Sequence, residues 1–474
     1  MDKLEQQIDR WMEHHLDDMV KYVMDLIRIP SIAQYEPQNR HPFGDGCAAA
    51  LDFMLQLAGR LGFETRNYDY YSGSARLPGR TDRTIGVFIH LDTTPSTNMW
   101  TSRPFEPEIR EDYIIGCGAE DNKGAAVAML YMLRCLKDLE VMLEHSILIV
   151  FGCGKKSYMQ DIDHFLRYEP APDVSLIADA NFPVCVGEKG SLNFELRCPV
   201  HSDRLIDFRA GVAANMVPHQ AYALLNGVSM EQAEALLHRD SRCSIIPVGP
   251  YVKVATGGLG GHAAFPEGTT SAIPVLARIL LESGLADEGC APVLRFLRDT
   301  YCTCQGEPFN LAMRDEAYGC NTHVCGLIRM NAGYLCQTVN IRYVPSLTGT
   351  QVAERACAAA AQAGMSFRML SDTPPNALAP QLEPIASLLT FIANHVIGKS
   401  PALQPYTMGG VTYAKKLPNA IPFGPNRGDI PSPFGLGRGK GHLPDEAVRI
   451  QDLENGLKIY VLSLIRIDPL VSYR

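Results

Sequence analysis

Apolar segments that end in a charged residue alternate with helical patterns between residues 60 and 180. Strands and helices that alternate in this way predict an α/β domain built on a sheet with mainly parallel strands. Ligands collect outside the carboxyl ends of the strands in such a sheet. Three of the predicted strands end at or just before the following residues: His90, the pair Lys155 and Lys156, and Asp179. The pattern therefore predicts one common site at this edge of the sheet.

The size and charge of the chain limit its organisation and its partners. A length of 474 residues exceeds what one hydrophobic core usually serves, which predicts two domains. A formal net charge of -9 argues against nucleic acid or an anionic membrane as the main partner. No apolar run is long enough to cross a bilayer. Residues 1–12 have the pattern of a charged amphipathic helix rather than that of a signal peptide, so we expect a cytoplasmic protein.

The sequence changes character after Gly190. Segments 251–255 and 336–343 are typical of strands, and 230–237 is typical of a helix. Pro-rich sequence close to residue 380 marks the return to the first pattern. The expected ranges are 1–186 for the first part of the α/β domain, 187–380 for an inserted α+β domain, and 381–474 for the second part of the α/β domain.

Five short motifs contain residues that can bind a metal or move a proton. The first contains His90 and Asp92. The second contains Asp121, in a glycine-rich turn before an amphipathic helix expected over 125–139. The others are the following: the segment 152–156, Asp179 with 187–190, and 441–446. Taken singly, a histidine at a strand end is more often structural than a ligand. In their order and spacing, however, the motifs resemble the zinc-dependent dipeptidase, aminoacylase and carboxypeptidase family, closest to its PepV-like bacterial carnosinase-type dipeptidases. The resemblance covers nearly the whole chain.

The resemblance implies a two-metal centre in a catalytic domain that carries an inserted lid domain. It assigns His90, Asp121 and Asp179 to one metal site, and His442 with a glutamate to a second site that shares Asp121. Asp92 corresponds to a carboxylate that orients the ligand histidine. Two such metals ionise a water and polarise the substrate amide, while a glutamate moves the proton. Zinc, or else manganese or cobalt, is the expected metal.

The chain departs from the family pattern at Lys155 and Lys156, where relatives carry two glutamates. Lys155 stands in place of the general base, and Lys156 stands in place of a ligand to the second metal. At about 4 Å and an effective dielectric constant of about 20, an ammonium group and a divalent ion repel each other by roughly 8 kcal/mol. We therefore predict that the chain binds one metal ion or none. A Lys155 that burial and nearby cations deprotonate would serve as a base instead.

The residues expected to hold a substrate are better preserved. The resemblance assigns His262 to stabilisation of the oxyanion. It assigns Asn215 and Arg342 to the substrate carboxylate, which suits the fork of a guanidinium group. Gly410 and Thr412 correspond to a substrate-facing loop. These residues imply a cleft between the catalytic and lid domains that binds a dipeptide or an N-acyl amino acid.

Three functions are compatible with this pattern. We favour a binding protein for small peptides or N-acyl amino acids in which two-metal hydrolysis is lost or strongly reduced, because both lysines changed together. The alternative is an active dipeptidase or amidohydrolase that uses a single metal at His90, Asp121 and Asp179. A scaffold or regulatory partner of an active relative is the third. The long inserted domain is similar to the type that closes within one chain, so a monomer is expected.

Overall fold

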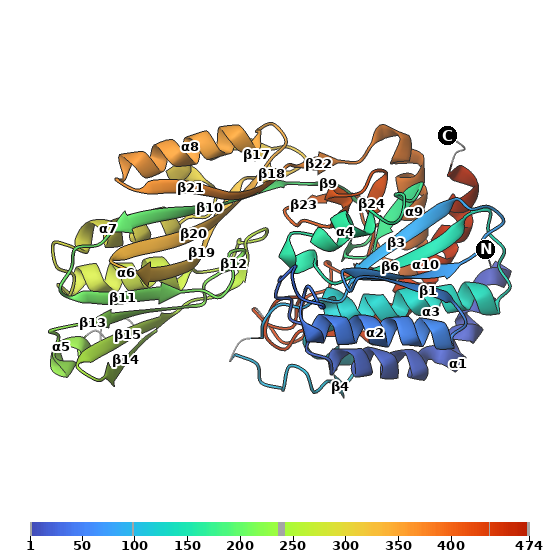
Figure 1. Cartoon of the computed structure of the whole chain (residues 1–474), viewed down its shortest axis with the longest axis horizontal. Coiled ribbons are helices and arrows are strands. Elements are labelled where there is room, and N and C mark those ends of the chain that lie inside the picture. Colours follow the sequence, from blue (N-terminus) through green and yellow to red (C-terminus); the bar gives the residue numbers. More distant parts are fainter. Residues whose placement is uncertain (1, 97–98, 236–241, 436, 472–474) are drawn as a thin grey trace. The chain divides into compact units, whose positions relative to one another are not determined.

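The computed structural model describes residues 2–96, 99–235, 242–435 and 437–471, which are shown in Figure 1. The chain divides into two compact units. Unit 1 comprises 1–186, 377–406 and 412–474, and unit 2 comprises 187–376 and 407–411. Compared with the expected ranges, 377–380 fall in unit 1 and 407–411 fall in unit 2. The second difference arises because Met408 accepts a hydrogen bond from the backbone of Lys189, which belongs to unit 2.

A six-stranded sheet forms the centre of unit 1, with the strand order β1-β2-β6-β3-β7-β24. The bounds are β1 Glu64–Tyr68, β2 Ser72–Leu77, β3 Thr84–His90, β6 Ser146–Gly152, β7 Val174–Ile177 and β24 Ala420–Pro422. Three pairs, β6-β3, β3-β7 and β7-β24, are parallel, and the two pairs toward β1 are antiparallel. Strand β6 is buried over its whole length, as expected for a central strand with both faces covered. The mixed, mainly parallel sheet agrees with the predicted fold class.

Helices pack around this sheet (Figure 1). Their bounds are α1 Asp2–Ile27, α2 Asp45–Arg60, α3 Gly124–Asp138, α4 Gln160–Phe165, α9 Glu383–Ile397 and α10 Ile450–Ile467. The N-terminal segment forms α1, as its pattern predicts. The prediction of an amphipathic helix over 125–139 is wrong in one respect, since 12 of the 15 residues of α3 are buried. Helix α3 packs against α1, α10 and the sheet, so it needs apolar residues on nearly all sides.

Short strands surround the carboxyl ends of the central strands. In unit 1, β4 Glu108–Arg110, β5 Tyr113–Ile115 and β26 Ala447–Arg449 form an antiparallel sheet, and β8 Ala180–Asn181 pairs with β25 Pro425–Asn426. The chain passes from one unit to the other within β9 Cys185–Glu188, β22 Asn376–Ala377 and β23 Tyr406–Met408. The pairing of β26 with β5 places the C-terminal segment that carries His442 beside the turn that carries Asp121.

Unit 2 is built on an eight-stranded antiparallel sheet with the order β14-β15-β13-β11-β19-β20-β10-β21. The bounds are β10 Gly190–Pro199, β11 Leu205–Ala210, β13 Gln220–Leu225, β14 Cys243–Val248, β15 Tyr251–Gly257, β19 Thr322–Asn331, β20 Tyr334–Tyr343 and β21 Ser366–Thr373. Two short pairs add β12 Met216–Val217 with β16 Gly261–His262, and β17 Arg314–Asp315 with β18 Gly319–Cys320.

The helices of unit 2 are α5 Met230–Glu234, α6 Ala272–Glu282, α7 Ala291–Tyr301 and α8 Gly349–Gln362. Helices α6 and α7 pack on each other, α6 contacts β13 and β15, and α8 contacts β10 and β21. The helix expected over 230–237 corresponds to α5, and its positions 236–237 lie outside the described residues. An antiparallel sheet with helices packed against it is the α+β arrangement that the sequence predicts for the inserted segment.

The core of unit 1 provides the first prediction. Ile149 lies in the middle of β6 and is fully buried, so Ile149→Ala should lower the free energy of unfolding by about 2–5 kcal/mol. Ile109 on β4 is 48% exposed, and Ile109→Ala is the matched control, with an expected change within about 0.5 kcal/mol. Both tryptophans, Trp11 and Trp100, lie in unit 1, so their fluorescence in a denaturant titration reports this unit. Equal effects of the two substitutions would contradict the assignment of β6 to the core.

Candidate functional site

The ends of three strands bring the predicted site residues of unit 1 together. His90 is the last residue of β3 and pairs in register with Gly152, the last residue of β6. Asp179 follows the end of β7 by two residues. Asp121 lies in the turn Ala119–Lys123, which leads directly into α3, and its peptide bond to Asn122 is cis. Parallel strands end at the same edge, so the side chains that follow them converge.

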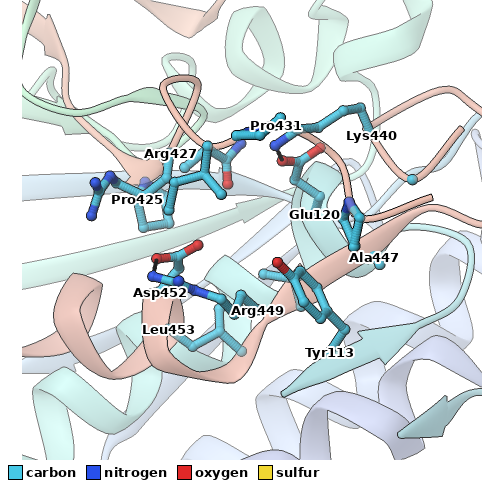
Figure 2. A pocket seen from close by; sticks show the side chains of 15 residues that line it. Tyr113, Glu120, Pro425, Arg427, Pro431, Lys440, Ala447, Arg449, Asp452 and Leu453 are labelled. Atoms are coloured by element: carbon cyan, nitrogen blue, oxygen red, sulfur yellow. Dashed lines mark hydrogen bonds and ion pairs between the residues drawn. The ribbon is translucent and has the colours of Figure 1, made fainter. Parts of the chain in front are cut away.

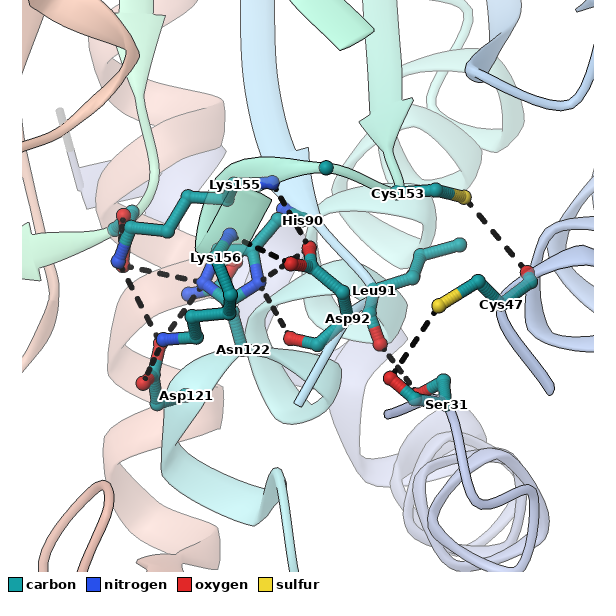
Figure 3. A network of polar contacts seen from close by, with 12 residues as sticks. Ser31, Cys47, His90, Leu91, Asp92, Asp121, Asn122, Cys153, Lys155 and Lys156 are labelled. Atoms are coloured by element: carbon teal, nitrogen blue, oxygen red, sulfur yellow. Dashed lines mark hydrogen bonds and ion pairs between the residues drawn. The ribbon is translucent and has the colours of Figure 1, made fainter. Parts of the chain in front are cut away.

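His90, Asp121 and Asp179 form the centre of the cluster, and Figure 3 labels the first two. His90 Nε2 lies 2.8 Å from Asp121 Oδ1 and 3.7 Å from Asp179 Oδ1. One nitrogen or oxygen from each of the three residues lies within 4.8 Å of the others, which is an arrangement that fits one divalent ion. Burial and the two lysines oppose a charge on His90, yet Asp121 helps to raise its pKa to about 10.

Lys155 contacts this donor set directly. Its Nζ lies 2.9 Å from Asp179 Oδ2 and 4.0 Å from Asp121 Oδ1. Burial lowers the pKa of Lys155, but the two carboxylates outweigh it and hold the pKa above its ordinary value. A deprotonated Lys155 that acts as a base is therefore disfavoured. The ammonium group is an internal counter-ion for both aspartates.

Lys156 occupies the space between Asp121 and His442. Its Nζ lies 2.6 Å from Asp121 Oδ2 and 2.8 Å from His442 Nε2, and the latter nitrogen lies 2.5 Å from the same carboxylate oxygen. Burial and the neighbouring Lys156 ammonium both lower the pKa of His442. Burial alone would raise the pKa of Asp121, but the ammonium groups of Lys156 and Lys155 outweigh it and hold the pKa of that carboxyl well below its usual range. Lys156 is therefore the cation that contacts both Asp121 and His442 in this arrangement.

Asp92 connects His90 to the turn 154–159, which carries Lys155 and Lys156 and is called the lysine turn. His90 Nδ1 lies 2.9 Å from the backbone oxygen of Asp92 and 3.4 Å from its carboxylate. The same carboxylate accepts the backbone N–H groups of Lys155 at 3.2 Å and of Lys156 at 2.7 Å (Figure 3). Asp92 therefore orients the imidazole chiefly through its main chain, while its side chain holds the turn that presents both ammonium groups.

The lysine turn is held from behind by a buried carboxyl group that the predicted set did not include. Asp161 accepts a hydrogen bond from the backbone N–H of Gly154 at 2.8 Å and another from the hydroxyl of Tyr413. Burial, with Asp92 nearby, raises the pKa of Asp161 to about 7. Tyr158 and Met159, which follow the turn, both have left-handed backbone conformations, with φ of 63° and 58°. Each costs about 1–2 kcal/mol, so the surrounding contacts must stabilise this turn.

Glu446 is a second buried carboxyl group that sequence reasoning missed as a site residue. It accepts backbone N–H groups from Gly118, Glu120 and Asp121 at 2.8–3.0 Å and so fixes the turn that presents Asp121. Burial and the charge of Asp121 raise its pKa to about 8. Its place at the end of the motif 441–446 was the only signal in the sequence.

Glu120 points away from the cluster. It pairs with Lys440 and accepts the backbone N–H of Gly441. It lines a cavity of about 20 Å³ with Tyr113 and Asp452, seen in Figure 2, which has room for about one water. Glu120 therefore does not add a carboxylate to the donor set of His90, Asp121 and Asp179.

The remaining predicted residues are divided between the units. Thr412 is buried in unit 1, where its hydroxyl accepts the backbone N–H of Ala414. In unit 2, Asn215 Nδ2 lies 3.1 Å from His262 Nε2. Arg342 donates to Asn340 Oδ1 at 2.8 Å and to the carbonyl of Gly409 at 3.0 Å, beside Gly410. In unit 2, therefore, the predicted substrate-binding residues Asn215 and His262 lie together, while Arg342 makes its own contacts.

A histidine and two aspartates that converge at the carboxyl edge of a mixed sheet form a donor set that fits a metal-dependent hydrolase. The sequence pattern of peptidase family M20/M25/M40 matches residues 86–466, and the chain belongs to this family. The family resemblance predicted from the motifs is thus confirmed. None of the helices in the described part of the chain has the length and apolar character needed to span a membrane.

Individual relatives agree with this assignment. "Putative dipeptidase YtjP" of Bacillus subtilis (strain 168) is 27% identical over 465 residues, which are 94% of this chain and 96% of that protein. The structure of the dipeptidase Dug1p from Saccharomyces cerevisiae has a TM-score of 0.62 at 13% identity and covers 98% of both chains. Human carnosine dipeptidase 1 has a TM-score of 0.60 at 15% identity, covering 98% of this chain and 99% of that one. The structural matches confirm the fold.

The segment that carries His442 provides the second prediction. Asp445 accepts hydrogen bonds from Thr101 N, Thr101 Oγ1 and Arg438 Nε, each at 2.8 Å. Burial would raise the pKa of Asp445, but Arg438 and Thr101 hold it below its ordinary value. A lowered carboxyl pKa stabilises the fold above the unfolded pKa of about 4, and this contribution is lost as the pH falls through the folded pKa.

Asp445→Asn should therefore lower the free energy of unfolding by about 1.5–3 kcal/mol at pH 7. The difference from the unchanged protein should shrink as the pH falls below about 4. Thermal unfolding followed by tryptophan fluorescence across this pH range measures both effects. Asp82→Asn removes a fully exposed carboxylate and is the matched control. A cost for Asp445→Asn that does not depend on pH would contradict the charged contact.

Proposed function

We propose that this member of the M20 family binds a dipeptide or an N-acyl amino acid and has lost, or has largely lost, two-metal hydrolysis. The observation that carries the proposal is the position of Lys156 Nζ, in contact with both Asp121 and His442. On the family pattern this lysine stands where a ligand to the second metal is expected. We infer that an ammonium group has taken the place of that ion.

Electrostatic magnitudes support this proposal. An ammonium group and a divalent ion about 4 Å apart repel by roughly 8 kcal/mol at an effective dielectric constant of about 20. Removing Lys156 from Asp121 would also leave a buried carboxylate without its nearest cation, which costs about 3–5 kcal/mol in buried pairs. Lys155, held as an ammonium by Asp179, cannot accept the proton of an attacking water. We therefore propose that the chain lacks both the general base and the ligand to the second metal, the two roles that the family pattern assigns to glutamates.

The proposed ligand class rests on groups in unit 2. His262 is held on both sides, because its Nδ1 accepts the backbone N–H of Ala264 at 3.2 Å and its Nε2 lies 3.1 Å from Asn215 Nδ2. The second N–H of the Asn215 amide suits a carbonyl oxygen. Asn340 and Gly409 hold two nitrogens of Arg342 and fix the plane of its fork, which suits a carboxylate. A small molecule that contains an amide and a carboxylate, such as a dipeptide or an N-acyl amino acid, matches both groups.

A second candidate function rests on the donor set itself. His90, Asp121 and Asp179 place three ligand atoms within 4.8 Å of one another, which fits one zinc, manganese or cobalt ion. When bound, such an ion would polarise an amide carbonyl. The protein would then be an active single-metal dipeptidase. We favour the binding function because Lys155 already neutralises two of these donors, and we propose a cytoplasmic monomer on the sequence arguments given above.

Turnover and binding separate these functions. The purified protein, loaded with zinc, manganese or cobalt, should hydrolyse a panel of dipeptides and N-acetyl amino acids at well below about 1 per second, the lower end of the usual enzyme range. Calorimetry should show that the same compounds bind. Turnover at or above that rate would establish the single-metal enzyme instead. Failure of the whole panel to bind would favour a scaffold function.

Exchange of both lysines provides a metal readout that does not depend on activity. Lys155→Glu combined with Lys156→Glu removes two positive charges and adds carboxylates beside His442 and Asp179, so the zinc content should rise toward two ions per chain. Equilibrium dialysis measures this content. The double Lys→Gln variant removes the charges without adding carboxylates and is the matched control.

Zinc should also stabilise the double Glu variant, by about 2.7 kcal/mol at a free concentration one hundred times the dissociation constant. The unchanged protein should show a much smaller shift in the same thermal unfolding experiment. A Glu variant that binds no more zinc than the Gln variant would argue against the proposed replacement.

A further inference from the structure

The turn 262–266 of unit 2 carries a large apolar side chain to which the proposed function gives no role. Phe265 is 55% exposed, whereas the preceding Ala263 and Ala264 are buried. The centroid of its ring lies 6.5 Å from that of the His262 imidazole, at an interplanar angle of 38°. His262 Nε2 in turn lies 3.1 Å from Asn215 Nδ2. The phenyl ring therefore lies beside the pair that contains the N–H group proposed for the ligand carbonyl.

Hydrogen bonds hold the backbone of this turn. The N–H of Phe265 donates to the carbonyl of His262 at 2.9 Å. Ala263 donates its N–H to the carbonyl of Asn215 at 2.8 Å, and its own carbonyl accepts the hydroxyl of Thr322 at 2.8 Å. The backbone that presents the phenyl ring is therefore fixed before a ligand binds, which lowers the entropic cost of binding.

Two contacts connect the same turn to Arg342. Thr322 on β19, which bonds to the turn, pairs in register with Arg342 on β20. Gly409 accepts a hydrogen bond from Arg342 Nη1 at 3.0 Å. It also packs closely on Ala264, since a Cβ atom on Gly409 would lie 2.7 Å from the carbonyl oxygen of Ala264. The backbone of Phe265 is therefore tied to both of the proposed recognition groups.

The chemistry of the ligand indicates which of its parts the ring would meet. In a dipeptide or an N-acyl amino acid, the amide carbonyl belongs to the N-terminal residue or to the acyl group. The groups nearest to a carbonyl bound by Asn215 are therefore the side chain of that residue or the acyl chain. An acyl chain of a few carbon atoms is long enough to span the 6.5 Å between the rings of His262 and Phe265. Burial of apolar carbon against an exposed aromatic ring is favourable, whereas a charged group would lose hydration there without compensation.

We propose that Phe265 is a specificity-determining residue whose ring contacts the acyl chain or the N-terminal side chain of the ligand. This inference rests on the proposed function, which supplies the contacts to the amide and the carboxylate. It narrows the ligand class to dipeptides and N-acyl amino acids that carry an apolar group next to the amide carbonyl. A charged group or a single methyl group at this position would gain little from the ring.

Calorimetric titration of the whole chain with N-acetylglycine and N-hexanoylglycine tests the role of Phe265. Both compounds contain the amide and the carboxylate, and they differ only in the length of the apolar acyl chain. The unchanged protein should bind N-hexanoylglycine about tenfold more tightly, which corresponds to about 1.4 kcal/mol. Phe265→Ala should reduce this preference to about twofold, while the dissociation constant for N-acetylglycine should change by less than about twofold.

Two further variants serve as controls. Phe265→Leu keeps an apolar side chain and should retain most of the preference. Tyr334→Ala removes a 42% exposed aromatic side chain at the opposite end of β20 from Arg342, and it should change neither dissociation constant.

The outcomes separate this inference from the proposed function. Equal affinity of the unchanged protein for the two compounds would overturn the role of Phe265 and leave the proposed function in place. The same conclusion would follow if Phe265→Ala kept the full preference or weakened both compounds equally. Failure of both compounds to bind the unchanged protein would overturn the inference together with the proposed function.

Discussion

The ion pairs between two lysines and two aspartates are the interaction on which the site of unit 1 depends. Lys155 and Lys156 extend from the turn after β6, Asp121 from the turn before α3, and Asp179 from the end of β7. These elements are distant in the sequence, and each contributes a charge that would be costly to bury alone. A buried pair is not strongly stabilising in itself, but loss of one partner leaves an unpaired charge that costs about 3–5 kcal/mol. The four charges therefore hold the ends of the strands in one arrangement.

The charge balance of the cluster bears on the proposed replacement of the second ion by Lys156. Lys155, Lys156 and His90, whose pKa is raised, supply three positive charges, and Asp92, Asp121 and Asp179 supply three negative charges. Glu446 adds no full negative charge near pH 7, since its pKa is raised to about 8. A divalent ion added to this neutral cluster would need to displace an ammonium group or a proton.

Much of the fold could be predicted from the sequence, and the site could be predicted in part. Strand ends are recognisable because an apolar run stops at a charged residue, and this signal located His90 and Asp179 on the sheet. Asp161 and Glu446 had no comparable signal. Their importance comes from backbone N–H groups that they accept, and those groups belong to turns far away in the sequence. The all-round burial of α3 was likewise hidden, because it depends on packing against α1 and α10.

The proposed recognition groups and the metal donors depend on different contacts, so a change in one set can leave the other set in place. Arg342 is held by Asn340 and Gly409, and His262 is oriented by Ala264, all within unit 2. None of these hydrogen bonds involves the lysines or aspartates of unit 1. A change from glutamate to lysine at the strand end would alter the charge of the metal donors, but it would leave the contacts that orient the recognition groups unchanged. A protein that loses the second metal in this way can therefore keep the groups that we propose recognise an amide and a carboxylate.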